Sequence, residues 1–136
     1  MKIRPLTENF AVSPQIHGRD IAKIAAQGYK TIINNRPDGE AWGQPRAADI
    51  EAEAKKHGLA YHHLPFSNRG LEPGQVEKMA DIVQSAGGPV LAFCRSGTRS
   101  AHTWALSQAG KMAVEDIIAA AANAGYDIRA LERFLR

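Results

Sequence analysis

Residues 90–100 have the sequence VLAFCRSGTRS, which indicates the fold class more clearly than any other segment. Its first four residues form a continuous apolar run after the breaker at 87–89, which is typical of a central parallel strand covered on both faces. The run ends at Cys94, a short loop follows, and residues 98–109 have the pattern of a helix. A strand that passes through a tight loop into a helix indicates an α/β fold.

The rest of the chain alternates short apolar runs with amphipathic stretches. The predicted strands are 10–13, 31–34, 59–64 and 90–93. The predicted helices run from Asp20 as N-cap to Gly28, from Pro45 to His57, from Pro73 to the breaker at 87, and over 98–109, 114–124 and 127–135. Strands separated by helices predict a single α/β domain over residues 1–136, with a mainly parallel sheet flanked by helices.

The composition excludes several classes of protein. The 136 residues are 44% hydrophobic and 23% charged, with 17 Lys+Arg against 14 Asp+Glu, as in an ordinary globular domain. The basic residues are scattered and are not interleaved with aromatic residues, so we expect no nucleic-acid partner. No apolar run is long enough to span a bilayer, and the first residues do not resemble a secretory signal. We therefore expect a cytoplasmic protein without a membrane partner.

The single cysteine, Cys94, lies where open α/β sheets bind their ligands, at the carboxyl end of a strand. Backbone N–H groups of residues 95–99 can converge there on an anion, and Gly97 permits the close backbone approach. The same groups favour a thiolate, which is the reactive form of cysteine. Arg99 can hold two oxygens of an oxyanion with its fork of N–H donors. We predict that Cys94 is a nucleophile and Arg99 the substrate clamp, although a lone cysteine is usually a small buried hydrophobe.

The other residues of this loop are predicted to contact the substrate. They are Arg95, Ser96, Gly97, Thr98 and Ser100. The hydroxyl residues among them could equally serve as helix caps, and Ser100 is the best candidate for a contact to the thiolate.

A second loop, NRPDGE at residues 35–40, follows a predicted strand and is expected at the same edge of the sheet. Arg36 is a candidate contact for an anionic substrate, and Asp38 or Glu40 could orient Arg99 or donate a proton. The alternative is an ordinary Pro-Asp-Gly turn with solvated charges. His62 and His63 point to opposite faces of one strand, so we predict neither a metal site nor a cofactor.

The segment CRSGTRS at residues 94–100 resembles the active-site loop of rhodanese-type sulfurtransferases and, in a longer form, that of cysteine-dependent phosphatases. With segments 12–16 and 31–40, it makes the chain from Ile3 onward resemble the bacterial β-lactamase-hydrolase-like family, in its phosphatase-like domain. The resemblance implies a fold like that of dual-specificity phosphatases. Some members of this family are fused to a persulfide dioxygenase of the metallo-β-lactamase fold, which implies sulfide metabolism and a persulfide dioxygenase as partner.

Three departures from the phosphatase pattern favour sulfur transfer. Four residues separate Cys94 from Arg99, whereas the phosphatase loop has five, and Phe93 stands where such phosphatases carry a histidine. Residues 64–70 contain no carboxylate that could protonate a leaving oxygen.

We therefore predict a sulfurtransferase that takes sulfur from thiosulfate or a persulfide and passes it, through a Cys94 persulfide, to a thiol such as glutathione. The first alternative is a cysteine phosphatase that acts through a Cys94 phosphocysteine. The second is a non-catalytic module that binds an anion or senses oxidants. The ligand is in each case a small anionic sulfur or phosphate compound.

Overall fold

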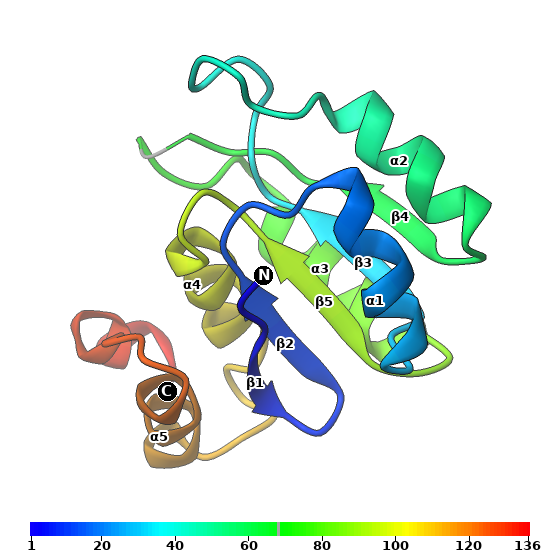
Figure 1. Cartoon of the computed structure of the whole chain (residues 1–136). Coiled ribbons are helices and arrows are strands. Elements are labelled where there is room, and N and C mark those ends of the chain that lie inside the picture. The colour runs from blue at the N-terminus through cyan, green and yellow to red at the C-terminus, as the bar shows by residue number, and fades with distance from the viewer. Residues whose placement is uncertain (68) are drawn as a thin grey trace.

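The computed structural model describes residues 1–67 and 69–136, which form one sheet between two layers of helices (Figure 1). The strands are β1 (Arg4–Thr7), β2 (Phe10–Ser13), β3 (Thr31–Asn34), β4 (Ala60–His63) and β5 (Val90–Phe93). The α-helices are α1 (Ile21–Ala26), α2 (Ala47–Lys56), α3 (Gln75–Ser85), α4 (Thr98–Ser107) and α5 (Val114–Asn123). Two 3-10 helices complete the chain, η1 (Gly18–Asp20) and η2 (Arg129–Phe134).

The strands follow the order β1-β2-β5-β3-β4. Strands β2, β5, β3 and β4 are parallel, and β1 pairs with β2 in antiparallel orientation. The predicted mainly parallel α/β fold is confirmed. Strand β1 was not predicted from the sequence, because it is short and contains Pro5, which a sheet tolerates at its edge.

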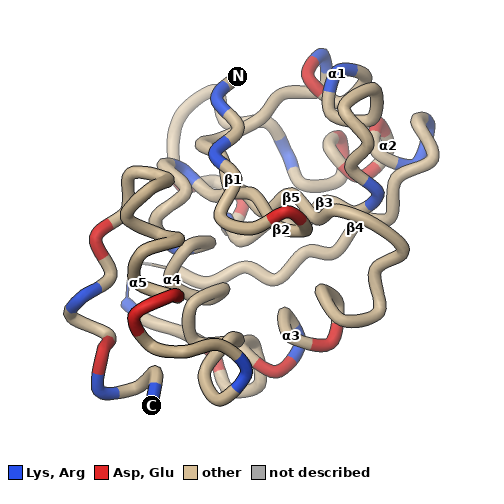
Figure 2. Tube along the Cα trace, turned by 90° about the horizontal axis from the view of Figure 1, so that it is seen from below, with Lys and Arg blue, Asp and Glu red and all other residues tan. Residues whose placement is uncertain are grey.

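Helices cover both faces of the sheet, and this explains why every residue of β5 is apolar. Leu91 and Phe93 pack with residues of α1 and α2, whereas Val90 and Ala92 pack with residues of α3, α4 and α5. Successive side chains of a strand point to opposite faces, so a strand between two helical layers needs apolar residues at every position. Figure 2 shows the same arrangement from below, with α1 and α2 on one side of the sheet and the other helices opposite.

Charged residues of both signs are interspersed along the outer helices and loops, and the central strands β3 and β5 contain none (Figure 2). Within residues 1–67 and 69–136, no helix has the length and hydropathy needed to cross a bilayer.

Several predicted helix boundaries differ from the structure, among them the start of α3, which was predicted at Pro73 and lies at Gln75. Asp20 ends η1 and makes no cap to α1, because its carboxylate accepts a hydrogen bond from the backbone N–H of His17 at 2.8 Å. The helix expected from Pro45 begins at Ala47, and the segment expected as a helix over 127–135 is the 3-10 helix η2.

Candidate active site

The parallel register brings four loops to one edge of the sheet. The last residues of β2 and β3, Ser13 and Asn34, both lie opposite Phe93, the last residue of β5. The last residue of β4, His63, lies opposite Asn34. The loops that follow these strands therefore leave the sheet side by side, as open α/β folds require of a binding site.

The loop after β5 holds Cys94 at the start of α4. The thiol is fully buried, and the backbone N–H of Gly97 donates to its sulfur at a distance of 3.1 Å. Gly97 has a φ of +94°, in the left-handed region that favours glycine, and this conformation turns the N–H group toward the sulfur. A hydrogen bond from a backbone N–H stabilises a thiolate over a thiol.

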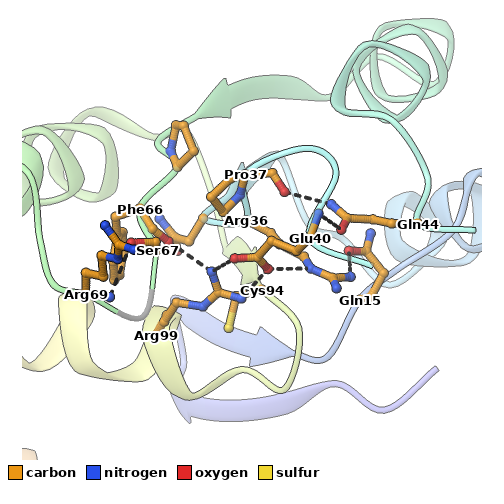
Figure 3. Close-up of polar contacts among 12 residues, drawn as sticks. Gln15, Arg36, Pro37, Glu40, Gln44, Phe66, Ser67, Arg69, Cys94 and Arg99 are labelled. Carbon is orange, nitrogen blue, oxygen red and sulfur yellow. Dashed lines mark hydrogen bonds and ion pairs between the residues drawn. The ribbon is translucent and has the colours of Figure 1, made fainter. Parts of the chain in front are cut away.

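The guanidinium of Arg99 lies beside Cys94 (Figure 3). Its Nη1 and Nη2 each donate to one oxygen of Glu40 at 2.7 Å, and Nη1 also donates to the carbonyl oxygen of Phe66 at 2.9 Å. Hydrogen bonds to Glu40, with the nearby Cys94 charge as a lesser contribution, raise the pKa of Arg99. Arg99 is therefore a fixed, permanently charged group next to the sulfur.

The hydrogen bonds of Arg99 leave one edge of its guanidinium for a ligand. A guanidinium has five N–H donors, and three of these are used by Glu40 and the Phe66 carbonyl. The other two, on Nε and Nη2, share the remaining edge of the planar group and are used neither by Glu40 nor by the Phe66 carbonyl. The other side chain that interacts with the guanidinium is that of Cys94. Two parallel donors of this kind match two oxygens of an oxyanion.

Glu40 also binds Arg36, so one carboxylate joins two arginines (Figure 3). Arg36 Nε donates to Glu40 at 2.8 Å, and Arg36 Nη1 donates to Gln15 Oε1 at 3.0 Å. The hydrogen bonds from Arg99 lower the pKa of Glu40 against the effect of its partial burial, and those from Arg36 add to this. Glu40 therefore stays ionised and orients Arg99, and it is not a proton donor at neutral pH.

Asp38 lies in the same loop but serves the neighbouring helix. Its carboxylate accepts a hydrogen bond at 2.8 Å from the N–H of Ala47, the first residue of α2. Of the two carboxylates considered for orienting Arg99, the structure gives this contact to Glu40. A proton-donor role for Asp38 stays a prediction.

The predicted substrate-binding residues fall into two groups. Arg95, Ser96 and Thr98 are exposed, and the hydroxyls of Ser96 and Thr98 are hydrogen-bonded to each other at 3.0 Å. Ser100 is buried, and its hydroxyl donates to Asn35 Oδ1 at 2.8 Å, which ties α4 to the loop after β3. Arg36 is buried and reaches the site through Glu40.

A pocket of about 300 Å³ adjoins Arg99 and is lined by residues of α4, of η2 and of the loop after β4. Its lining is mostly apolar and includes Phe66, Leu71, His102 and Leu131. Burial lowers the pKa of His102, so this side chain is neutral at physiological pH. Outside position 68, no three His, Cys, Asp or Glu side chains are grouped as a metal site would need.

Two contacts of the site could not be predicted directly from the sequence. The carbonyl of Phe66 is a backbone group, and any residue type would supply it. Tyr126, whose hydroxyl donates to the carbonyl of Ser96 at 3.0 Å, comes from a segment 30 residues further along the chain. Gln15 could have been found, because it follows a strand at the same sheet edge as Cys94.

Residues 2–111 match the family model for the beta-lactamase hydrolase-like protein, phosphatase-like domain. The chain belongs to this family. A beta-lactamase hydrolase-like protein from Xylella fastidiosa (strain Temecula1) is 33% identical over 130 residues, which are 94% of this chain and 30% of that protein. The chain thus spans about a third of the length of the curated relatives that it matches.

Solved structures confirm the fold expected from the resemblance. A crystal structure described as a "putative phosphatase" from Neisseria meningitidis is 37% identical, covers 99% of this chain and 96% of that chain, and has a TM-score of 0.85. The structure of PTPMT1 is 16% identical, covers 98% of this chain and 92% of that chain, and has a TM-score of 0.76. The phosphatase-like domain therefore has the dual-specificity-phosphatase-like fold.

Proposed function

We propose that this domain is a cysteine-dependent phosphatase that hydrolyses small phosphate esters through a Cys94 phosphocysteine. The proposal rests on the Nε–Nη2 edge of the Arg99 guanidinium, which Glu40 does not occupy and which lies beside the buried Cys94 sulfur. Its two parallel N–H donors match two oxygens of a phosphoryl group. The relative of 37% identity, described as a putative phosphatase, favours the same chemistry over sulfur transfer.

The reaction has two displacement steps at phosphorus. In the first, the Cys94 thiolate forms a bond to phosphorus while the bond from phosphorus to the ester oxygen breaks, and the leaving aryloxide or alkoxide takes a proton from solvent water. In the second, water attacks the phosphocysteine and gives a proton to the solvent, the sulfur–phosphorus bond breaks, and inorganic phosphate and the thiolate are released. Arg99 and the loop N–H groups bind the phosphoryl oxygens in both transition states.

The leaving group is expected to be a weak base. Residues 64–71 contain no Asp or Glu, and Glu40 is held ionised by two arginines. The carboxylate of Asp38 is bound to the N-terminus of α2, so we expect none of these groups to give a proton to the leaving oxygen. General acid catalysis contributes about 100- to 10,000-fold in rate where it is present. Aryl phosphates, whose leaving oxygen needs little protonation, should therefore react much faster than alkyl phosphates.

Sulfur transfer is a second candidate, and the short loop favours it. Only four residues separate Cys94 from Arg99, which suits a group smaller than a phosphoryl group. In this case Cys94 would take the outer sulfur of thiosulfate, with sulfite as the leaving anion, and a thiol acceptor such as glutathione would remove it. A persulfide dioxygenase would be the expected partner.

One preparation can test both candidates. The protein and its Cys94→Ser variant are incubated with p-nitrophenyl phosphate, with a phenyl phosphate of higher leaving-group pKa, and separately with thiosulfate. Phosphate release and the intact mass are measured for each sample. We expect phosphate release by the native protein, faster from the nitrophenyl ester, and none by Cys94→Ser.

The outcomes are distinct. A gain of one sulfur atom at Cys94 that glutathione removes, without release of phosphate, would overturn the proposal in favour of sulfur transfer. If the thiol is reactive but neither compound is turned over, the proposal is wrong and the domain is an anion-binding or redox-sensing module.

A further inference from the structure

Tyr126 contacts the Cys94 loop from outside the part of the chain that the family model matches. It follows α5, whereas the family model ends at residue 111. Its hydroxyl donates to the carbonyl oxygen of Ser96 at 3.0 Å, and the residue is 8% exposed. Neither the predicted nucleophile, Cys94, nor the predicted clamp, Arg99, takes part in this hydrogen bond.

The accepting carbonyl belongs to the peptide unit that points at the nucleophile. In a trans peptide, the C=O and N–H groups point in opposite directions. The Ser96–Gly97 peptide directs its oxygen to Tyr126 and its N–H to the Cys94 sulfur, at 3.0 Å and 3.1 Å. Rotation of this peptide would withdraw the N–H from the sulfur, and it would break the hydrogen bond to Tyr126 at the same time.

The neighbouring peptide is held in the same manner. The carbonyl oxygen of Arg95 accepts a hydrogen bond at 3.2 Å from the backbone N–H of Gln15, in the loop after β2. Two successive carbonyls of the loop are therefore bound from outside. Of these two contacts, only the one from Tyr126 is made by a side chain that a substitution can remove.

Tyr126 itself is fixed in position. The guanidinium of Arg4 lies over its ring, 5.6 Å from the centroid, and donates to the carbonyl of Ala124 at 3.0 Å. A Cβ atom at Gly97 would overlap the Tyr126 hydroxyl, so the two residues are in close contact. Burial raises the pKa of Tyr126, with Arg4 opposing it, so the hydroxyl keeps its proton and remains a donor.

We propose that Tyr126 is a positioning residue that holds the Ser96–Gly97 peptide with its N–H directed at the Cys94 sulfur, and so stabilises the thiolate. The inference rests on the proposed role of Cys94 as the nucleophile, and it does not depend on which substrate Cys94 attacks.

The test is an ultraviolet titration of the thiolate in the native protein and in Tyr126→Phe. Because Cys94 is the only cysteine, the same titration of the corresponding Cys94→Ser proteins gives the background to subtract. We expect the midpoint of thiolate formation in Tyr126→Phe to move to higher pH by about one unit, the effect of weakening one hydrogen bond to a charged group. The rate of alkylation by iodoacetamide at neutral pH should fall by up to about tenfold with it.

Tyr29→Phe is the control, because Tyr29 is a half-buried tyrosine that packs against the cluster on the other face of the sheet. It should leave the midpoint unchanged. An unchanged midpoint in a folded Tyr126→Phe, with native-like circular dichroism, would overturn the proposal. Since the titration needs no substrate, this failure is separate from a failure to release phosphate.

Discussion

Among single residues, Arg99 depends for its role on the planar geometry of its guanidinium as well as on its charge. Its end-on edge is bound by Glu40, and this fixes the direction of the edge that remains. Lysine would keep the charge but would lack both the planar fork and the second attachment. The contribution of Arg99 to a reaction at Cys94 should therefore not survive a charge-conserving substitution.

We predict that Arg99→Lys lowers kcat/KM for an aryl phosphate by about 100-fold or more, the usual effect of removing an oxyanion donor. Steady-state kinetics of the purified variant measure this. Arg19→Lys is the matched control, because Arg19 is exposed, lies in η1 and has no side-chain hydrogen bond to the described residues. A loss of less than about fivefold in Arg99→Lys would contradict the clamp role.

The negative charge of Glu40 should contribute both to the catalytic activity and to the stability of the protein. Its pKa in the folded protein lies below the ordinary value of 4.5, so its stabilising effect is complete above that pH and is lost as the pH falls toward the folded value. We predict that Glu40→Gln is less stable than the native protein at neutral pH and that the difference shrinks below pH about 4.5. Thermal unfolding across this pH range measures it, and a constant difference would contradict the assignment.

The same substitution should slow the reaction. A glutamine cannot hold both Nη groups of Arg99 with charged oxygens, so the guanidinium loses its fixed direction. We predict that kcat falls by about 10- to 100-fold, as expected when a catalytic group is misplaced by a fraction of an ångström. Glu51→Gln is the comparison and should leave kcat unchanged, because that carboxylate pairs with Lys55 on the surface of α2 and makes no hydrogen bond to Arg99.

At the scale of elements, the strand–loop–helix unit β5–α4 depends on a glycine at position 97. The residue combines a φ of +94° with contact to Tyr126, whereas Gly110 has a φ of +80° and nothing within 4 Å of an added Cβ. Both substitutions to alanine strain the backbone, and only Gly97→Ala also creates a steric overlap.

We predict that Gly97→Ala lowers the melting temperature more than Gly110→Ala does and also abolishes turnover. Gly110→Ala should cost about 1 kcal/mol, the usual cost of left-handed backbone at a non-glycine residue. Thermal unfolding of both variants gives the comparison. Equal destabilisation would mean that the contact between position 97 and Tyr126 does not constrain the loop.

Elements with strong local patterns could be predicted from the sequence. The strands ending at Ser13, Asn34 and Phe93 were placed correctly, and their parallel register brings the Cys94 loop and the loop after β3 together. The choice between Asp38 and Glu40 could not be made, because the turn between them decides which carboxylate faces Arg99. Backbone direction within a turn is not encoded in residue spacing.

At the scale of the whole molecule, the site depends on both ends of the chain. Arg4 in β1 contacts Ala124 and Tyr126, and Tyr126 contacts the loop that carries Cys94. These contacts join residues that are 120 and 30 positions apart. Sequence patterns report neighbours within a turn or a strand, so contacts over such separations become visible only in three dimensions.

The segment after residue 111 should therefore be required for folding and not only for the position of Tyr126. Ile117, Ile128 and Leu135 are at most 1% exposed and belong to the same core cluster as Trp104. Burial of each such side chain contributes about 1.5–3 kcal/mol, so together with Tyr126 they are comparable to the total stability of a small domain, about 5–15 kcal/mol.

We predict that a chain truncated after residue 111 loses cooperative thermal unfolding and that its tryptophan emission shifts to longer wavelength. The shift reports on Trp104, because Trp42 is already fully exposed, at 102%. Phe134→Ser is the control: Phe134 is 53% exposed and lies in the same segment, so this variant should keep both the transition and the emission. A truncated chain with a native-like transition and unchanged emission would mean that residues 2–111 form a complete core. In that case α5 and η2 would serve the Cys94 loop alone, and the loss of activity on truncation should then equal that of Tyr126→Phe.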